Sequence, residues 1–280
     1  WIPCYAATLD NDSINGIKVL RDSLYSSKKS VIYPYKVAKG IYLHFSYPDT
    51  IFQRILDSEL NEKKKYKYSD LGYYLFQRII EKTYSEKLNI LVEDYFYKAL
   101  GMENMGYLPL DRIDKERIAP TEQDYFYRGQ LIHGDVHDQG AAMLGGVGGH
   151  AGVFSNANDL AKLMQMYLNN GEYAGERYLS TSTIKEFTKC QFPQNRNRRG
   201  AGFDKTVLAN QKGGPTSENA SSEGFGHSGF TGTLAWADPK TQIVYVFLSN
   251  RTYPDSNNNK LLKMDVRTNI MEVIYDSLND

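Results

Sequence analysis

The sequence predicts an α+β fold: an antiparallel sheet flanked by helices, with a second lobe built mostly of helices and loops. Apolar residues recur at helical spacing in the middle of the chain, and the spacing becomes strand-like after residue 200. Because helices and strands occupy separate parts of the chain, an alternating parallel βαβ sheet is not expected. We expect one domain over 1–280, with the helical lobe at about 60–190 and the sheet and C-terminal helix at about 200–280.

The first 65 residues show little periodic pattern and predict only one short helix. Two Tyr-Pro steps, at Pro34 and Pro48, bias the backbone away from long helices. Within this part, apolar side chains at helical spacing occur over residues 51–60. The rest of this part is therefore expected to be irregular.

Two helices are predicted between residues 69 and 101. The first runs from Leu71 to Lys82, with Ser69 or Asp70 as its N-cap. Its buried face is expected to carry four aliphatic side chains, Leu71, Leu75, Ile79 and Ile80. The second helix runs from about 89 to 100 and stops at Gly101, because glycine readily takes the left-handed conformation that ends a helix.

A loop-rich stretch follows, and it contains a glycine-rich run from Gly140 to Gly152. A helix capped by Asn158 or Asp159 should come next and end at Asn170-Gly171. Its predicted buried stripe is Leu160, Leu163, Met164, Tyr167 and Leu168. A further short helix is predicted over 182–187.

The C-terminal part predicts a β-hairpin and a closing helix. Two β-rich runs, 231–237 and 243–250, are joined by the turn sequence Asp-Pro-Lys-Thr. One face of the second strand is expected to carry Val244, Val246 and Leu248. The closing helix runs from about 259 to 278, with an apolar stripe of Leu262, Val266, Ile270, Val273 and Ile274.

Composition excludes several classes of protein. The 33 basic and 33 acidic side chains cancel, so a chain-wide attraction to nucleic acid or to anionic membranes is not expected. Basic clusters at 63–65 and 196–199 are interpreted as solvated surface. The chain has no apolar stretch long enough to predict a transmembrane helix. Its two cysteines, Cys4 and Cys190, cannot build a disulfide framework.

Three alternative sites are weak on sequence grounds. His133 and His137 are four residues apart, but no helical pattern or neighbouring Glu supports a zinc site. The glycine-rich run lacks the preceding strand of a nucleotide-binding loop, so its glycines should allow close approach to another segment or to a substrate. Ser228 is preceded by Gly226 as in a nucleophile elbow, but Phe230 replaces the second glycine and a strand follows.

A pair of short motifs carries the strongest chemical signal. Tyr68-Ser69-Asp70 stands at the start of a helix, and His227-Ser228-Gly229 precedes the predicted hairpin. A phenol that has lost its proton under the influence of neighbouring cations can accept the proton of a serine nucleophile and later return it. A backbone N–H at a strand edge, beside a cationic or hydrogen-bonding side chain, can hold an oxyanion. Together the two motifs suit acyl transfer to a serine.

In this order the motifs resemble those of serine hydrolases of the penicillin-binding protein and class C β-lactamase family. That family uses Ser-x-x-Lys, then Tyr-x-Asn, then Lys/His-Thr/Ser-Gly. The resemblance extends to Leu100-Gly101-Met102, to His137-Asp138 and to the run from Gly145 to Ser155. It implies a β-lactamase/transpeptidase-like fold that is incomplete at its N-terminus.

The resemblance also implies roles for individual residues. Tyr68 would be the base-like residue, His227 its charge partner across one cleft, and Phe230 a backbone donor to the oxyanion. Asp70, Ser228, Gly229 and Phe230 would contact the substrate. No cofactor and no metal are implied.

Two positions depart from the family pattern. Asp70 stands where the family has Asn, which replaces an amide donor by a carboxylate. Ser-x-x-Lys occurs at Ser26 and at Ser182, but the first lacks a helical pattern and the second follows the tyrosine motif. We therefore expect the nucleophile in a segment upstream of Trp1, and expect the chain alone to be inactive.

The predicted function is that of a serine hydrolase acting on amide or ester bonds through an acyl-enzyme. Its substrate could be a D-amino-acid peptide of the cell wall, a β-lactam or an ester, since one scaffold serves all three. The resemblance implies a bacterial periplasm or envelope location. The alternative is a non-catalytic module that recognises cell-wall peptide or docks a partner, such as a fused glycoside hydrolase.

Overall fold

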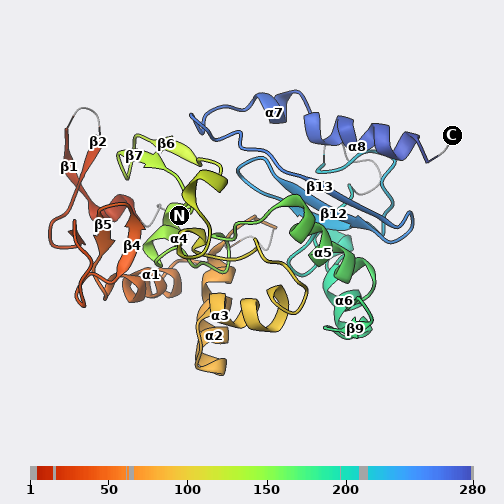
Figure 1. Ribbon diagram of the computed structural model, residues 1–280, viewed down its shortest axis with the longest axis horizontal. Helices are drawn as coiled ribbons and strands as arrows, with labels where there is room; N and C mark the ends of the chain where they lie inside the picture. Colours follow the sequence, from red (N-terminus) through yellow and green to blue (C-terminus); the bar gives the residue numbers. More distant parts are fainter. Residues whose placement is uncertain are drawn as a thin grey trace. The chain divides into compact units, whose positions relative to one another are not determined.

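The computed structural model describes residues 5–14, 17–60, 62, 66–195, 197–207 and 214–278. The chain divides into two compact units, each made of several segments. The first unit comprises Trp1–Tyr95, Gly106–Phe154 and Thr252–Ser256, and the second comprises Phe96–Met105, Ser155–Arg251 and Asn257–Asp280. Helices and antiparallel strands occur in both units, so the predicted α+β class is confirmed (Figure 1). In the described part of the chain, no helix is long and apolar enough to cross a membrane.

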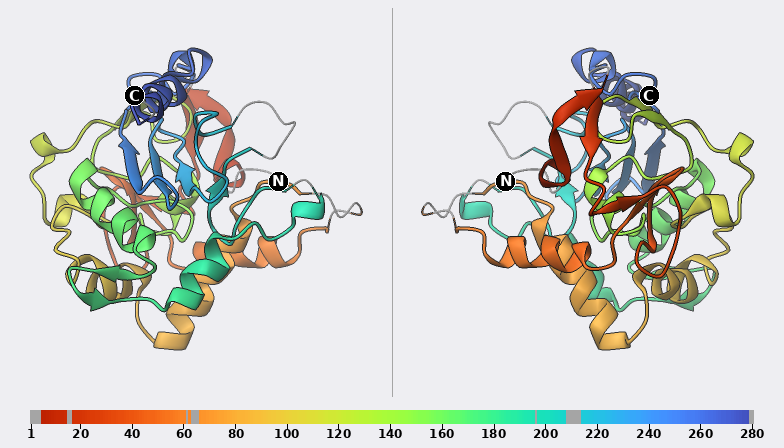
Figure 2. Two further views of the ribbon diagram at one scale, coloured as in Figure 1. Left: turned by 90° about the vertical axis from the view of Figure 1, so that its right-hand side faces the viewer. Right: turned by 90° about the vertical axis from the view of Figure 1, so that its left-hand side faces the viewer.

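The first unit contains strands where the sequence predicted irregular chain. They form an antiparallel hairpin and a three-stranded sheet in the order β3-β5-β4 (Figure 2, right). Their bounds are β1 (Leu9–Ile14), β2 (Ile17–Leu20), β3 (Tyr25–Ser26), β4 (Tyr35–Ala38) and β5 (Ile41–Leu43). The prediction was wrong here because strands of two to six residues are too short to show a clear alternation of apolar and polar side chains.

The helices of the first unit follow the predicted order with shifted ends. The short predicted helix is α1 (Tyr47–Leu56), which begins earlier than expected with Pro48 in its first turn. The next is α2 (Leu71–Tyr84), and the following helix is α3 (Leu88–Val92) continued by a π-helical turn, η2 (Glu93–Tyr97). Gly101 takes the positive φ predicted for a helix end. The remaining elements are η1 (Ala6–Thr8), η3 (Pro109–Asp111), η4 (Lys115–Arg117), β6 (Glu122–Asp124), β7 (Gln130–Ile132) and α4 (Gln139–Met143).

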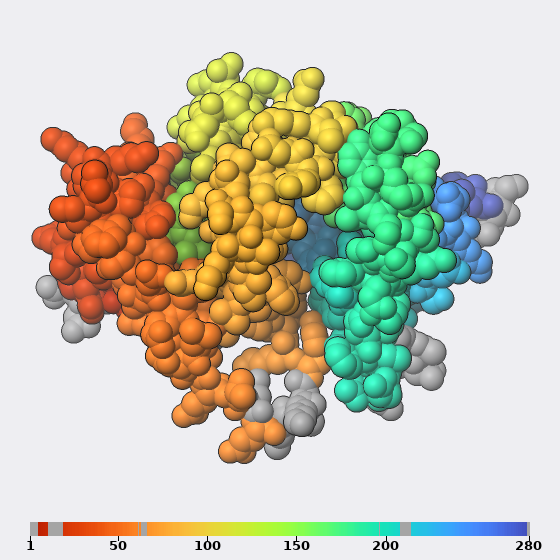
Figure 3. Space-filling model, turned by 90° about the horizontal axis from the view of Figure 1, so that it is seen from below, coloured from red at the N-terminus to blue at the C-terminus, as the bar shows by residue number. Residues whose placement is uncertain are grey.

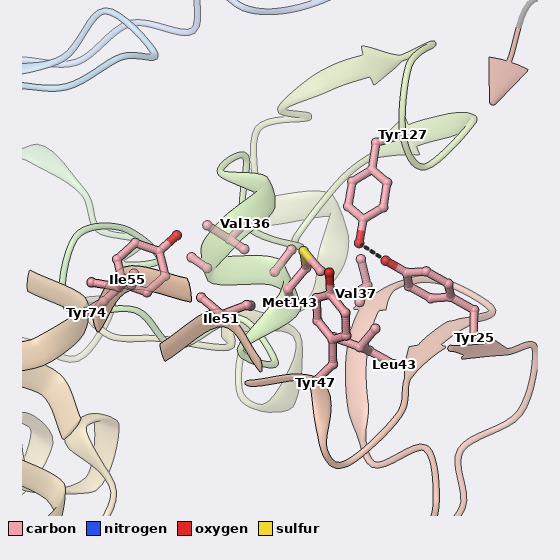
Figure 4. Packing of buried hydrophobic residues seen from close by; sticks show 12 residues of the cluster. Tyr25, Val37, Leu43, Tyr47, Ile51, Ile55, Tyr74, Tyr127, Val136 and Met143 are labelled. Atoms are coloured by element: carbon pink, nitrogen blue, oxygen red, sulfur yellow. Dashed lines mark hydrogen bonds between the residues drawn. The ribbon is translucent and has the colours of Figure 1, made fainter. Parts of the chain in front are cut away.

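The core of the first unit joins the N-terminal sheet to helices α1, α2 and α4. Figure 4 shows buried side chains from all of these elements in one cluster, with the Tyr25 and Tyr127 hydroxyls hydrogen-bonded at 2.7 Å. Helix α2 contributes Tyr74 to this cluster. Ile79 on the same helix is 58% exposed, and Ile80 is also exposed, so the predicted buried face of α2 was wrong at these two positions. Figure 3 shows the residues around α2, coloured orange to amber, at the surface of this unit.

The second unit is a four-stranded antiparallel sheet between helices. The strands β10 (Asp204–Lys205), β11 (Phe225–Ser228), β12 (Leu234–Asp238) and β13 (Ile243–Phe247) lie in that order. Trp236 and Tyr245 pack on one face against α8 (Val266–Asp276). Phe225 and Ala237 pack on the other face against α5 (Ala157–Leu168) (Figure 1). The predicted hairpin is therefore confirmed, although both of its faces are covered.

Two helices of the second unit differ from their predicted details. Asn156 caps α5, two residues before the predicted cap, by accepting the Asp159 N–H. The closing helix is broken into α7 (Lys260–Lys263) and α8 by Asp265, whose φ is +49°. On α8, Met271 and Tyr275 are buried, whereas the predicted stripe residues Ile270 and Val273 are exposed, because a neighbouring face of the same helix packs against the sheet. The other elements are β8 (Glu172–Tyr173), β9 (Glu176–Arg177), α6 (Thr181–Thr188) and η5 (Pro193–Asn195).

Candidate active site

The Tyr68-Ser69-Asp70 motif lies directly before α2, as the sequence predicted. Asp70 occupies the N-cap position without a side-chain cap, while the Ser69 Oγ accepts the Leu71 N–H at 3.2 Å. The Asp70 carbonyl accepts N–H groups from the first turn of the helix, Tyr73 at 2.9 Å and Tyr74 at 3.4 Å. The Tyr68 side chain is 58% exposed. The motif thus places a phenol at the surface, immediately ahead of a helix whose first turn is well ordered by hydrogen bonds.

The glycine-rich run packs against this same helix. The Gln77 side chain is buried, and its amide donates to the Val147 carbonyl and accepts the Gly149 N–H, both at 3.0 Å. A Cβ at Gly149 would lie 2.4 Å from the backbone oxygen of Tyr73. The absence of side chains therefore lets the loop approach the backbone of α2. Of the two alternatives that the sequence left open, close approach to another chain segment is the one found at Gly149.

A second contact fixes α2 from the side of α4. Asp138 caps α4 by accepting the Ala141 N–H at 2.7 Å, and the same oxygen accepts the His150 Nε2–H at 2.8 Å. The His150 ring stacks on Tyr74, with ring centroids 4.1 Å apart. Burial alone would raise the pKa of Asp138, but its hydrogen bond to His150, the His150 charge and the Ala141 N–H together hold this pKa below its usual value. The helix that follows Tyr68 is thus held by the glycine-rich run through both Gln77 and Tyr74, and Asp138 holds His150 in place.

Gly149→Ala is expected to lower the free energy of unfolding by about 1–3 kcal/mol, because the added methyl group meets backbone rather than a movable side chain. Urea denaturation of the 1–280 chain measures this change. Gly72→Ala, in the first turn of α2, is the matched control, since its Cβ would meet only the Phe76 ring at 4.0 Å. This control should be neutral or stabilising by up to about 1 kcal/mol. Equal effects of the two substitutions would contradict the close packing of the loop on α2.

The His227-Ser228-Gly229 motif lies at the end of strand β11 and precedes the hairpin of β12 and β13, as predicted. His227 and Ser228 pair with Ala235 and Leu234 of β12. A tight turn connects the two strands: the Gly229 N–H donates to Thr233, and the Gly232 N–H donates to Gly229. Because a turn and a strand follow Ser228, the geometry does not form the strand-to-helix elbow of a nucleophilic serine.

Phe230 lies in this turn and is 64% exposed, with the Arg251 guanidinium 4.5 Å from its ring centroid. Gly232 has a φ of +101°, a conformation that side-chain-bearing residues rarely adopt. The glycine at position 232 therefore allows this tight turn to form. The turn places the backbone of Gly229 and Phe230 at the end of the sheet. Tyr68 belongs to the first unit and His227 to the second, so their approach across one cleft stays a prediction.

Both ring nitrogens of His227 have hydrogen-bond partners. Its Nε2 lies 2.8 Å from Nη1 of Arg199, and its Nδ1 lies 2.7 Å from the carbonyl oxygen of Ser228. An arginine can only donate and a carbonyl can only accept, so Nε2 is the acceptor and Nδ1 carries the proton. These two contacts define a neutral His227.

The arginine cluster was wrongly interpreted as solvated surface at its described positions. Arg198 binds the Asp204 carboxylate through two nitrogens, at 2.7 and 2.9 Å, and Arg199 approaches the same carboxylate at 3.3 Å. Asp204 is itself buried. Arg196 and the lysine cluster at 63–65 lie outside the described residues, as does Cys4. Burial of the shared carboxylate is the physical reason why these two arginines face inward.

The remaining candidate residues occupy ordinary surroundings. Ser26 is exposed at the end of β3, where its Oγ accepts the Lys28 N–H at 3.1 Å. Ser182 is exposed in α6, with its Oγ 2.9 Å from that of Ser180. His133 Nε2 lies 2.6 Å from the Ile118 carbonyl, and His137 Nε2 lies 3.2 Å from Glu122. Neither serine opens a buried helix, and the two histidines have separate partners.

The sequence analysis missed three residues that contact the candidate motifs or the elements that carry them: Arg199, Asp204 and Gln77. The signal for Arg199 was the adjacent Arg198-Arg199 pair, but its partner His227 is 28 positions away. The apolar residues of α2 predicted that the face carrying Gln77 is exposed to solvent, but Gln77 is buried. Hydrogen-bond partners this distant in sequence leave no local pattern.

The comparisons with known proteins agree on one family. The family model described as Beta-lactamase matches residues 32–266. A protein of Escherichia coli strain K12, named provisionally as a D-alanyl-D-alanine carboxypeptidase, is 33% identical over 272 residues, which cover 90% of this chain and 62% of that protein. A Salmonella gallinarum protein with the same provisional name is 34% identical over 72% of this chain and 49% of its own length. The chain thus spans about half to three fifths of these relatives.

Among solved structures, simvastatin synthase (LovD) from Aspergillus terreus superposes with a TM-score of 0.56. Its sequence is 15% identical, and the match covers 84% of this chain and 64% of that one. At this identity the likeness concerns the fold. It agrees with the α+β architecture described above.

Proposed function

Because the chain belongs to the β-lactamase family, we propose that it is part of a serine hydrolase that cleaves the terminal peptide bond of D-alanyl-D-alanine peptides. The observation that carries this proposal is the family match over residues 32–266, which includes both Tyr68 and His227. The provisional names of the bacterial relatives support the choice of peptide over simple ester. Such a substrate would place the protein in the bacterial periplasm or envelope.

The proposed reaction proceeds through an acyl-enzyme. The serine oxygen attacks the carbonyl carbon of the penultimate D-alanine, and its proton passes to Tyr68, which accepts it as the phenolate and becomes a neutral phenol. The C–N bond then breaks, and the departing amine takes the proton from Tyr68. Water hydrolyses the ester in the second half of the reaction and restores the serine. Throughout, the Phe230 N–H would stabilise the negative charge on the carbonyl oxygen.

The nucleophile of this proposal lies outside the 280 residues of the chain. Both Ser-x-x-Lys sequences of the chain support this assignment by their surroundings, since Ser26 is on a short strand and Ser182 is on an exposed helix. Asp70, in place of an asparagine, would leave a carboxylate beside the substrate. A binding module that keeps the cleft without chemistry is the competing function, and Asp70 is the residue that favours it.

Covalent labelling by a fluorescent penicillin tests the proposal. The product of the complete gene is expected to become labelled stoichiometrically, because an activated serine opens the β-lactam ring. The 1–280 chain alone is expected to remain unlabelled. Labelling of 1–280 that survives the double substitution Ser26→Ala and Ser182→Ala would contradict the assigned position of the nucleophile. If the complete product neither becomes labelled nor cleaves a D-alanyl-D-alanine peptide, the binding module is the better description.

A further inference from the structure

Arg251 contacts three consecutive residues of the turn that connects β11 to β12. Its backbone N–H donates to the Thr231 carbonyl at 3.0 Å. The stem of its side chain lies beside Gly232, where an added Cβ would be 3.4 Å from the Arg251 Cγ. Its guanidinium lies over the Phe230 ring, 4.5 Å from the ring centroid. One residue thus holds the turn at Phe230, Thr231 and Gly232.

The guanidinium that covers Phe230 is itself fixed by hydrogen bonds. Its Nη1 donates to the Asn258 carbonyl at 3.0 Å and to the Asn259 side-chain oxygen at 3.3 Å, directly before α7. Arg251 is buried, whereas Phe230 is largely exposed. An exposed side chain ordinarily changes rotamer rapidly, but an arginine cation is attracted to the face of an aromatic ring. The buried guanidinium therefore restricts the exposed ring.

The turn is held on both sides of the Phe230 N–H, which is the donor assigned to the oxyanion. Before it, the Gly229 N–H donates to the Thr233 carbonyl at 2.8 Å. After it, the Thr231 carbonyl accepts two donors from the segment 249–251, since the Ser249 hydroxyl also donates to it at 3.4 Å. The direction of the Phe230 N–H is therefore set by its neighbours in the turn and by the segment 249–251.

We propose that Arg251 is a positioning residue, which fixes this turn so that the Phe230 N–H points at the substrate oxygen that becomes negative during the reaction. A backbone donor stabilises an oxyanion best when it is aligned before the charge forms, because no reorientation is then needed during the reaction. Arg251 acts through Phe230 and Thr231 and does not need to touch the substrate. Its role in the reaction rests on the proposed function, whereas its hold on the turn does not.

The hold on the turn is tested in the 1–280 chain by hydrogen exchange of the Gly229 and Gly232 N–H groups, measured by NMR. Both groups donate within the turn. Arg251→Met, which keeps a long side chain and loses the guanidinium, should speed their exchange by about 2–30-fold, the range of a cation–π contact. Phe230→Leu should have a similar effect, because it removes the ring. Arg177→Met is the control: it removes an exposed arginine of β9 in the same unit and should leave both rates unchanged.

The role in the reaction is tested with the product of the complete gene and a D-alanyl-D-alanine peptide. Arg251→Met should lower kcat by about 10–100-fold and leave KM nearly unchanged, because the oxyanion forms only after the substrate has bound. The rate is divided by the number of serines that a fluorescent penicillin finally labels, so that unfolded molecules are not counted. Arg251→Lys, which keeps the positive charge, should recover part of the loss. Arg177→Met should keep the wild-type kcat.

A double substitution separates positioning from a direct effect of the Arg251 charge on the oxyanion. If Arg251 acts through the ring, Phe230→Leu should itself lower kcat, and adding Arg251→Met should cost little more. If the two losses multiply instead, Arg251 acts independently of the ring that it covers, and the positioning role is overturned.

The outcomes of the exchange and rate measurements separate this proposal from the proposed function. Exchange at Gly229 and Gly232 that is unaffected by Arg251→Met would overturn the hold on the turn. A raised KM with an unchanged kcat would overturn the role in the reaction. If the wild-type protein does not cleave the peptide, the proposed function fails and the role of Arg251 in the reaction fails with it. The exchange rates then still decide whether Arg251 holds the turn.

Discussion

Tyr68→Phe is expected to lower kcat of the intact hydrolase at least about a hundredfold, since loss of a general acid–base group typically costs about 10²–10⁴ in rate. The substitution keeps the ring and removes only the oxygen that accepts and returns the proton. Because the side chain is 58% exposed, little packing is lost and the melting temperature should hardly change. Steady-state kinetics with a D-alanyl-D-alanine peptide, together with thermal unfolding, measure both effects.

Neighbouring residues supply the controls for Tyr68. His227→Ala should reduce turnover less than Tyr68→Phe, and Ser228→Ala should reduce it least. Asp70→Asn, which restores the residue found in the family motif, should be tolerated or mildly activating. One result would contradict the role of Tyr68. If Ser228→Ala abolished acylation while Tyr68→Phe left it intact, Ser228 would be the nucleophile and Tyr68 would not be the base.

Arg128→Ala is expected to remove about 3–5 kcal/mol from the free energy of unfolding, the usual effect of breaking a buried ion pair. The Arg128 side chain is fully buried between Asp124, at 2.7 Å, and Glu122, at 3.1 Å. It also donates to the carbonyls of Val136 and His137, at 2.7 and 2.9 Å. Alanine would leave both carboxylates and both carbonyls without this donor in the interior of the first unit.

The pairing of Arg128 with Asp124 also predicts how the loss of unfolding free energy in Arg128→Ala depends on pH. Burial raises the pKa of Asp124, but the Arg128 charge and the hydrogen bonds from Tyr127, Arg128 and Phe126 outweigh it and hold this pKa below its usual value. A depressed carboxyl pKa stabilises the fold above the pKa of the unfolded chain, and this stabilisation is lost as the pH falls through the folded-state pKa. The difference between wild type and Arg128→Ala should therefore narrow below about pH 4.

Urea denaturation of the two proteins at pH 7 and at lower pH measures this difference. Lys189→Ala is the control, because Lys189 pairs with Glu186 at 2.6 Å while both side chains are more than half exposed. Exposed pairs contribute about 0–1 kcal/mol, so this variant should unfold close to wild type. A difference between wild type and Arg128→Ala that stays constant as the pH falls would show that the destabilisation is due to lost packing and not to the buried charges.

The sequence by itself determined those features that depend on neighbours a few residues apart. The helices near 71–84, 157–168 and 181–188 follow from apolar spacing, and the hairpin of β12 and β13 follows from two β-rich runs around a turn. Gly101 has the backbone conformation that its place at a helix end predicts. The family was also evident, because its tyrosine and histidine motifs are short continuous stretches of chain.

The tertiary structure alone decided which faces are buried and which charges are paired. Gln77 is buried rather than Ile79, because Val147 and Gly149 of a distant loop supply its hydrogen bonds. Asp265 divides the closing helix, and its second part buries Met271 in place of the predicted Ile270 because the sheet packs against that face. Arg199 faces inward because its guanidinium contacts Asp204 on β10 and His227 on β11. Such pairings depend on partners brought together by the fold, and local periodicity carries no information about them.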